Sequence, residues 1–362
     1  MNKFTICSTT INRPTFLENL IKNGKRHGYN NFNIIVIGDY KSPPENKDYL
    51  QNLSKKTKIE IYYMDVKEQK NFLRKYRNLD KILPYNWGGR KMLANFISVK
   101  EKSPITIQID DDNFIQNNDF FKFHSVVGTN SEVKVCSTKS KWVNVYKALN
   151  ERKKLPIYPR GFSYENRYKN EKIFIKKKKV KISVCNGLVL GDPDIDASSR
   201  IFWPINIKSV KKSFLPQFAV DKNNWCPWNN QNTSSYFNIT QIYFTPASVG
   251  RNSDIWTSLL ICKISSHLNE VICFGQPLVK QIRNLHSNFK DYEDEKFCNY
   301  YSFKFEKFLD ETRLSKKNHI ECLDEIIQKG IRYFSKSKSH IDVFTLNYFK
   351  EYKLWLDEVS KL

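Results

Sequence analysis

The order of apolar and polar positions divides the first 113 residues into short strands and helices. Four segments have the dense apolar runs or the period-two alternation of strands: 3–9, 31–39, 58–65 and 103–113. Apolar residues at helical spacing separate them at 15–23 and 90–102. Strands and helices that alternate with short connections predict an α/β fold with a largely parallel, buried sheet.

The remaining residues show two further patterns. Residues 114–290 are less regular and include a basic stretch at 167–181. Apolar residues recur at spacings of three and four through 303–362, which predicts helices at the end of the chain.

The chain is strongly basic, with 60 Lys and Arg against 37 Asp and Glu and a net charge of +23. Nucleic acid, an anionic membrane surface and a phosphate-bearing substrate are the partners that such a charge suggests. The basic residues are spread along the sequence, and no zinc-finger, RNP or helix-turn-helix pattern accompanies them. We therefore rank nucleic acid below the other two partners.

No apolar run is long enough to span a bilayer, and the first residues lack the apolar core of a signal peptide. We expect a cytoplasmic protein, with peripheral attachment to the inner face of a membrane as the alternative.

Three consecutive carboxylates, Asp110, Asp111 and Asp112, end the strand predicted at 103–113. Like charges this close raise one another's pKa unless a cation offsets them. On a strand, Asp110 and Asp112 point to the same face, and Mg²⁺ prefers such oxygen ligands together with substrate phosphates. Ligands of open α/β sheets bind beyond the carboxyl ends of the strands. The triplet therefore indicates a divalent-cation site, with a solvated acidic turn as the alternative.

Other candidates each have an ordinary structural explanation as well. Asp39 follows a β-branched run, so it either binds a base or ribose or belongs to a turn. The Gly-Gly-Arg-Lys sequence at 88–91 precedes a helix and offers donors for a diphosphate, or is a simple turn. Asp254 is a helix cap or a catalytic carboxylate, and His286 is a lone histidine among polar neighbours. The aspartates at 192–196 lack the glycine and closing glutamate of an EF-hand.

These motifs together resemble the nucleotide-diphospho-sugar glycosyltransferases of the GT-A fold. More narrowly, the chain is similar to the STELLO-type glycosyltransferases and their bacterial relatives, and more distantly to the reversibly glycosylated polypeptides, the UDP-arabinopyranose mutases. The matching segments keep their order over about residues 5–295: TTINRP (9–14), VIGDYKSP (36–43), PYNWGGRKMLANF (84–96), IDDDN (109–113), YPRGF (158–162), GLVLGDPDIDASSR (187–200), NNQNT (229–233), GRNSDIWTSLL (250–260) and RNLHSNFKDYEDE (283–295).

The resemblance assigns a role to individual positions. It implies that the nucleotide-sugar donor is bound by Thr9, Arg13, Asp39, Arg90, Asp110 and Asp111. It implies that the sugar and acceptor pocket contains Arg160, Asp194 and Asp196, that Asp254 is the acceptor-side base, and that the metal ligands are Asp112 and His286. The implied metal is Mn²⁺ or Mg²⁺.

The resemblance also implies a fold and an activity. We expect a Rossmann-like, mixed but mostly parallel sheet flanked by helices: a nucleotide-sugar half at 1–115, an acceptor half at 116–295 and a helical extension at 296–362. The implied enzyme is a metal-dependent hexosyl- or pentosyltransferase that uses a UDP-sugar by default. Its acceptor would be a glycan or lipid-linked molecule in surface polysaccharide or glycan synthesis. The alternatives are a sugar-nucleotide mutase, in which Arg160 would carry the glycosyl group, and a non-enzymatic nucleic-acid-binding protein.

Overall fold

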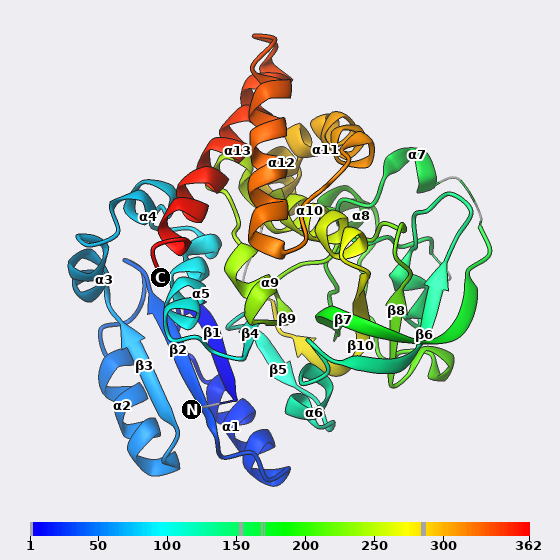
Figure 1. Ribbon diagram of the computed structural model, residues 1–362. Helices are drawn as coiled ribbons and strands as arrows, with labels where there is room; N and C mark the ends of the chain where they lie inside the picture. Colours follow the sequence, from blue (N-terminus) through cyan, green and yellow to red (C-terminus); the bar gives the residue numbers. More distant parts are fainter. Residues whose placement is uncertain (1–2, 152–154, 168, 170, 284–286) are drawn as a thin grey trace.

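The computed structural model describes residues 3–151, 155–167, 169, 171–283 and 287–362. In these residues ten strands form one sheet in the order β3-β2-β1-β4-β9-β7-β6-β8-β10-β5 (Figure 1). The strands are β1 (Phe4–Thr10), β2 (Phe32–Gly38), β3 (Glu60–Met64), β4 (Ile105–Ile109), β5 (Asn113–Ile115), β6 (Asn130–Ser137), β7 (Phe174–Leu190), β8 (Gln217–Val220), β9 (Asn232–Tyr236) and β10 (Glu270–Gln281).

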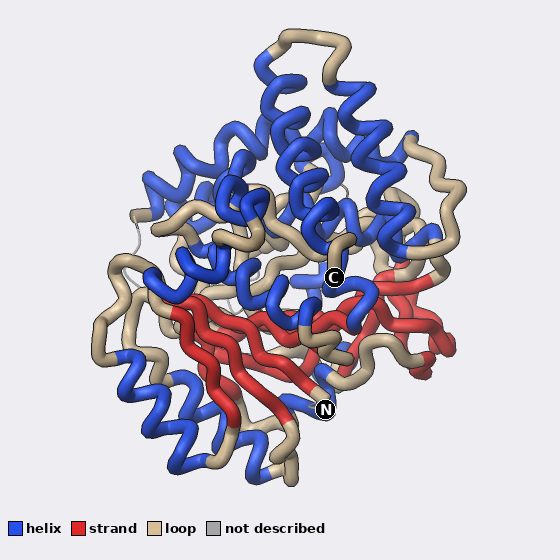
Figure 2. Tube along the Cα trace, turned by 60° about the vertical axis from the view of Figure 1, so that its left-hand side comes forward, coloured by secondary structure: helices blue, strands red, loops and turns tan. Residues whose placement is uncertain are grey.

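Helices cover both faces of the sheet (Figure 2). The α-helices are α1 (Phe16–Arg26), α2 (Asn46–Thr57), α3 (Val66–Leu73), α4 (Arg77–Ile82), α5 (Met92–Lys100), α6 (Phe120–His124), α7 (Tyr164–Arg167), α8 (Ala197–Phe202), α9 (Phe237–Ile242), α10 (Ser253–His267), α11 (Asn288–Glu311), α12 (His319–Phe334) and α13 (His340–Val359). The 3₁₀ helices are η1 (Gly88–Lys91), η2 (Val145–Ala148), η3 (Lys212–Phe214) and η4 (Ala247–Asn252).

The first four strands form the parallel part of the sheet, as the sequence predicts. β1 pairs in parallel with β2 and β4, and β2 pairs in parallel with β3. Their carboxyl ends therefore meet at one edge, where β1 ends at Thr10, β2 at Gly38 and β4 at Ile109. A parallel sheet is covered on both faces, and the residues of β2 and β4 are buried almost throughout.

The second half of the sheet is mixed. β9 is antiparallel to β4 and to β7 and so joins the two halves. The 17-residue strand β7 pairs with β6 along its first half and with β10 along its second. The predicted α/β class, with helices flanking a large sheet and a helical end of the chain, is confirmed.

Alternate residues of each central strand face two different cores. In β2, Ile34 and Val36 pack with α1, α2 and α6, whereas Ile35 and Ile37 pack with α5, α10 and the C-terminal helices. This alternation explains why the strand is continuously apolar. It also leaves the carboxyl edge of the parallel strands as the place where polar side chains gather.

The C-terminal helices are part of the larger core rather than an appended unit. The ring of Trp256 in α10 stacks on Phe305 in α11, with centroids 4.2 Å apart and planes 6° apart. In α13, Trp355 Nε1 donates to the Gln241 carbonyl at 2.9 Å and the Tyr352 hydroxyl donates to the Ile242 carbonyl at 3.0 Å. The boundary expected at residue 296 falls inside α11. None of the helices in the described ranges is long and apolar enough to cross a membrane.

Candidate functional site

A cavity of about 480 Å³ opens at the carboxyl edge of the parallel strands. Eight of the side chains predicted from the sequence line it: Thr9, Asp39, Asp110, Asp111, Asp112, Arg160, Asp194 and Asp254. Thr9 lies in β1, and Asp39 and the three aspartates at 110–112 follow β2 and β4; Arg160 lies in the loop before α7, Asp194 follows β7, and Asp254 lies in the first turn of α10.

Each carboxylate of the acidic triplet (Asp110, Asp111 and Asp112) has a different partner. Asp110 forms an ion pair with the buried Lys91, whose ammonium nitrogen lies 2.5 Å from Asp110 Oδ1. Asp111 accepts a hydrogen bond from the Thr10 hydroxyl at 2.6 Å. Asp112 accepts one from the side-chain amide of Gln281 at 2.9 Å. Among the described residues, no lysine or arginine forms an ion pair with Asp111 or Asp112, so these two members of the triplet are the ones available to meet a cation.

Burial and the neighbouring Asp110 carboxylate raise the pKa of Asp112 to about 6. Burial also raises the pKa of Asp111, against the opposing hydrogen bond from Thr10. The triplet therefore holds negative charge that is costly without a counter-ion, as the sequence indicates.

Asp39 organises the loop that forms one wall of the cavity. One carboxylate oxygen accepts from the backbone N–H of Tyr40, and the other accepts from the backbone N–H of Asn86, both at 2.7 Å. Asn86 has a positive φ of 56°, which asparagine tolerates better than most residues. At Gly89, a Cβ atom would lie 2.0 Å from the Trp87 ring, so only glycine lets that ring lie against the loop.

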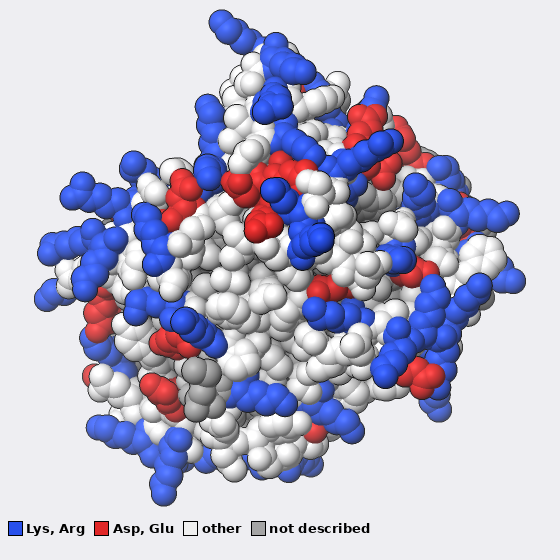
Figure 3. Space-filling view, viewed as in Figure 1, with Lys and Arg blue, Asp and Glu red and all other residues white. Residues whose placement is uncertain are grey.

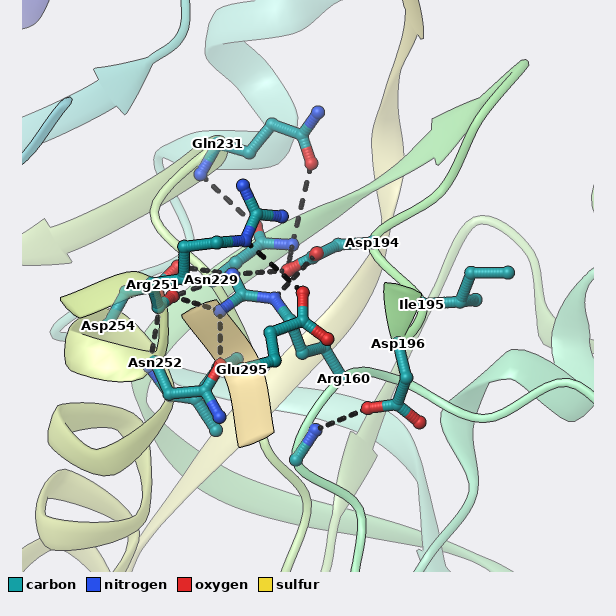
Figure 4. Close-up of polar contacts among 12 residues, drawn as sticks. Arg160, Asp194, Ile195, Asp196, Asn229, Gln231, Arg251, Asn252, Asp254 and Glu295 are labelled. Carbon is teal, nitrogen blue, oxygen red and sulfur yellow. Dashed lines mark hydrogen bonds and ion pairs between the residues drawn. The ribbon is translucent and has the colours of Figure 1, made fainter. Parts of the chain in front are cut away.

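Arg160 lies between two carboxylates on the opposite wall (Figure 4). It forms a two-pronged pair with Asp194, Nε to Oδ1 and Nη2 to Oδ2, each at 2.9 Å. Its Nη2 also donates to both oxygens of Asp254 at 3.2 Å. Its Nη1 donates to Asn252 Oδ1 at 3.0 Å and to the Arg251 carbonyl. Every nitrogen of the guanidinium group is therefore engaged.

The pKa values of the two carboxylates that contact Arg160 shift in opposite directions. Burial would raise the pKa of Asp194, but the two-pronged pair with Arg160 holds it well below the usual value. Burial raises the pKa of Asp254, Arg160 opposes this only in part, and the charge of Asp194 adds to the rise. Paired carboxylates with divergent pKa values are typical of sites in which one is fixed in charge and the other exchanges a proton.

A second group of ion pairs connects the cavity to α11. Arg251 and Arg283, which both line the cavity, contact Asp291 of α11 at 3.0 Å and 3.1 Å. Arg251 also contacts the buried Glu295, one turn further along the helix, at 3.3 Å. The first half of α11 therefore forms part of the frame of the cavity.

Three of the described residues that were expected in the site do not line the cavity. Arg13 is exposed and stacks on the ring of Tyr49 at 4.2 Å. Arg90 is fully buried beneath the cavity floor, where it lies 3.7 Å from the ring centre of Tyr85 and donates to Gln69. Asp196 is buried in an ion pair with Arg167.

Another expected residue, His286, lies outside the described residues. Arg90 is not available to a diphosphate because its side chain is fully buried in the protein core. The side chain of the next residue, Lys91, is also buried, but its ammonium group contacts Asp110 of the triplet.

Several polar residues of the cavity were not singled out from the sequence, namely Asn229, Gln231, Arg251 and Arg283. Asn229 donates to Asp194 Oδ2 at 3.0 Å, and the Gln231 carbonyl accepts from the backbone N–H of Asp110 at 3.1 Å. All four lie in segments that carry the family resemblance. The signal was therefore present in the motifs, but periodicity or charge alone could not reveal it.

The positive charge of the molecule is not gathered at this site. Figure 3 shows Lys and Arg spread around the rim of one face rather than along one groove. In β7 the four consecutive lysines at 176–179 lie on a strand segment that, within the described sheet, pairs with β6 alone. Lysines on such an edge block pairing with another chain, which accounts for part of the basic stretch.

No protein-family model and no curated protein matches the chain. Among solved structures, it is similar to the mannosyltransferase PcManGT from Pyrobaculum calidifontis in complex with GDP-Man and Mn²⁺. The identity is 8%, the TM-score is 0.38, and the match covers 99% of this chain and 73% of that chain.

It is also similar to two structures of TarS from S. aureus. One is TarS 1–349 in complex with UDP, with 10% identity, a TM-score of 0.36 and coverage of 99% of this chain and 91% of that chain. The other is a longer TarS chain, with 10% identity, a TM-score of 0.35 and coverage of 98% and 54%. These TM-scores all lie below 0.5, so only the residues of the cavity bear on the function of this chain.

Proposed function

We propose that the protein is a metal-dependent glycosyltransferase of the GT-A type. It would move a sugar from a nucleotide-diphosphate donor, by default a UDP-sugar, to a glycan or lipid-linked acceptor in surface polysaccharide or glycan synthesis. The observation that supports this most directly is the convergence of the acidic triplet, the loop at 86–89 and the Asp194–Arg160–Asp254 group on one cavity. The first two suit a metal and a nucleotide diphosphate, and the third suits an acceptor.

The residues of the triplet fit a divalent cation that is held in part by its substrate. Among the described residues there is no group of three or more His, Cys, Asp or Glu side chains that would enclose a metal by themselves. Asp112 offers a half-buried carboxylate that forms no ion pair with a described lysine or arginine, and Asp111 lies beside it. Mg²⁺ and Mn²⁺ commonly take one or two carboxylates and complete their shell with phosphate oxygens and water. A metal held there would neutralise charge on the departing nucleotide diphosphate.

The cationic side chains of this chain would hold the donor from the other side. Arg251 and Arg283 line the cavity and are each held by carboxylates behind them, so their remaining donors are oriented before substrate arrives. Preorganised donors of this kind stabilise developing negative charge without a cost of reorganisation. The backbone of Gly88 and Gly89 lets the donor approach the wall closely.

Asp254 is our candidate for the base that accepts a proton from the acceptor hydroxyl. It lines the cavity, its pKa is raised by burial, and Arg160 fixes its orientation. A base in this position contributes about 10²–10⁴-fold to the rate.

Arg160 is a poor candidate for the glycosyl carrier of a mutase. All its nitrogens are bonded, and although burial would lower its pKa, Asp194 and Asp254 raise it well above the usual value. It therefore stays protonated and cannot act as a nucleophile.

The proposal is tested by a thermal-shift screen of UDP-, GDP- and other nucleotide sugars with and without Mn²⁺. A ligand that binds only the native state raises the melting temperature by mass action. We expect at least one nucleotide sugar to raise it in the presence of Mn²⁺ and to do so much less after chelation. The result that would overturn the proposal is the absence of any shift, with the Asp112→Asn and wild-type proteins behaving alike throughout the screen.

A further inference from the structure

Two adjoining cavities lie apart from the candidate site. Their volumes are about 340 Å³ and 240 Å³, and both are lined by Ser140, Trp142 and Asn166. Of the described residues that line them, none lines the cavity at the carboxyl edge of the parallel strands. We call the two cavities together the tryptophan groove.

Backbone pairing places two tryptophan rings side by side on the wall of this groove. The N–H of Val143 donates to the Trp225 carbonyl at 2.9 Å, and the N–H of Trp225 donates to the Lys141 carbonyl at 2.6 Å. Trp142 and Trp225 therefore form a parallel bridge, and their rings stack with centres 6.3 Å apart and planes 27° apart. The ring of Phe162 packs edge to face against Trp142 at 5.4 Å. The groove thus has a fixed aromatic wall.

Polar groups without a partner remain in the groove. The indole N–H groups of Trp142 and Trp225 form no hydrogen bond with a described residue, and both stay accessible to solvent although Trp142 is only 9% exposed. Glu306 of α11 lines the smaller cavity and likewise forms no hydrogen bond or ion pair with a described residue.

The carboxyl group of Glu306 is mostly neutral at pH 7. Burial and the neighbouring Glu165 raise its pKa to about 8, against the opposing charge of Arg167. A neutral carboxyl donates one hydrogen bond and accepts others. The groove therefore offers three donors, two indole N–H groups and one carboxyl, beside aromatic faces.

We infer that the tryptophan groove is a second carbohydrate-binding site, which holds an oligosaccharide away from the reacting sugar. A sugar ring has a face of C–H groups that packs on an aromatic ring, because the face of the aromatic ring is negatively polarised. Its hydroxyl groups need hydrogen-bond partners, which the indole donors and the Glu306 carboxyl supply. The larger cavity also falls within the range of about 300–1,000 Å³ that is usual for small-ligand sites.

The lining favours a neutral glycan over other ligands. The charged side chains that line the groove include Lys141, Arg167, Glu165, Glu171 and Asp310. A nucleic acid, which is bound through cations on its phosphates, would therefore meet carboxylates as well. An apolar peptide or a lipid chain would cover the indole donors without pairing them, which is unfavourable.

One loop connects the groove with the candidate site. The segment 158–167 carries Arg160 into the candidate site and Phe162 into the groove. Arg167 of the same segment also lines the groove, and it forms an ion pair with the buried Asp196. If the proposed function is correct, the groove binds remote sugar residues of the acceptor, and this favours a polymeric glycan as the acceptor.

The test is binding of the fluorescently labelled full chain to an array of neutral and acidic oligosaccharides, with duplex DNA on the same surface. We expect the wild type to bind at least one neutral oligosaccharide and Trp225→Leu to bind it at least tenfold more weakly. The matched control is Trp203→Leu, which changes another partly buried tryptophan that lines neither cavity and should bind like the wild type. Binding of no oligosaccharide, or equal binding by Trp225→Leu and the wild type, would overturn the inference.

Glu306 provides variants that leave the aromatic wall unchanged. Glu306→Gln keeps a donor and an acceptor, so it should bind the same oligosaccharide within threefold of the wild type. Glu306→Ala keeps neither and should bind it at least fivefold more weakly. Full binding by Glu306→Ala would also overturn the inference.

The nucleotide-sugar thermal shift separates this inference from the proposed function. Trp225 and Glu306 do not line the cavity of the candidate site, so the shift of their variants should equal that of the wild type. Failure of the proposed function would appear in that shift, whereas failure of the second carbohydrate site would appear only on the array.

Discussion

Lys91 and Asp110 form an ion pair of 2.5 Å in which the lysine side chain is 1% exposed and the aspartate side chain is 40% exposed. The lysine also donates to the Asn230 carbonyl at 2.8 Å. The pair places one buried positive charge beneath the acidic triplet. It therefore offsets one of the three carboxylates from inside the protein and leaves the others for the cavity.

Because Lys91 is buried and Asp110 is partly exposed, we expect their single substitutions to lower the unfolding free energy by different amounts. Asp110→Asn leaves a buried ammonium group without a counter-charge and should cost about 3 kcal/mol of unfolding free energy, the lower limit for broken buried pairs, because Asp110 itself is partly exposed. Lys91→Met leaves a carboxylate that water already screens, so it should cost less, about 1 kcal/mol. Urea unfolding of both variants and of the double variant measures the coupling. If the costs simply add, the pair does not interact energetically.

Replacing Asp112 by Asn should remove the metal dependence of the protein. We expect Mn²⁺ in the presence of UDP to bind at least tenfold more weakly by calorimetry, because the carboxylate without a cationic partner is lost. The melting temperature should change little, since Asn keeps the hydrogen bond with Gln281. Glu132→Gln, which changes an exposed carboxylate on β6, is the matched control. Unchanged Mn²⁺ binding in Asp112→Asn would refute the metal role.

Asp254→Asn should separate chemistry from donor binding. We expect the transfer rate to fall by about 10²–10⁴-fold while the dissociation constant of the donor stays within threefold. Rates and calorimetry on the same preparation measure the two effects. Equal losses in both would mean that Asp254 only supports the start of α10.

The same carboxylate predicts how transfer depends on pH. A base works when it is ionised, and burial raises the pKa of Asp254 above its usual value. The rate should therefore increase with pH through that raised pKa, and the acid limb of the profile should disappear in Asp254→Asn. If Asp254→Asn still loses activity in acid as the wild type does, another titrating group is responsible for that part of the pH profile.

His124 predicts a loss of stability in acid. Its side chain is fully buried; Nε2 lies 3.0 Å from Asn232 Oδ1, which can only accept, and Nδ1 lies 2.9 Å from the Ser234 hydroxyl. Burial lowers its pKa from 6.5 to about 3, so the unfolded chain binds the proton more readily.

The stability that depends on a neutral His124 is complete above pH 6.5 and is lost as the pH falls toward 3. Between pH 7.5 and 5 this amounts to about 2 kcal/mol. Urea unfolding at both values should show this loss in the wild type and a smaller one in His124→Gln. His27→Gln, at a partly exposed histidine, should lose as much as the wild type.

The C-terminal helices should be required for folding. Trp355 is fully buried against α9 and the ring of Phe244, which lies 5.0 Å away, so Trp355→Ala should cost about 3–5 kcal/mol. A chain that ends at residue 311 should fail to unfold cooperatively by circular dichroism. Leu362→Ala, at the exposed end, should be neutral. A cooperative, stable truncated chain would show instead that α12 and α13 are an independent addition.

The strands at the start of the chain could be predicted from the sequence because their signal is local. Burial on both faces requires continuous apolar runs, and these end in Thr10, Gly38 and the acidic triplet at the same edge. The triplet could be recognised in the same way, since three adjacent carboxylates need an explanation wherever they fold. The motifs around Arg160, Asp194 and Asp254 were recognisable through family resemblance, although their distances along the chain say nothing of their contacts.

Only the tertiary structure decided which of two neighbouring cationic side chains contacts the acidic triplet. Arg90 and Lys91 are adjacent and equally plausible in sequence, but the turn of η1 directs one into the core beside Tyr85 and the other toward Asp110. It also decided that Arg160 joins Asp194 to Asp254, because β7 and α10 meet only through long-range packing. Side-chain direction at a helix start and the meeting of distant segments depend on the whole core, and no local pattern of residues encodes them.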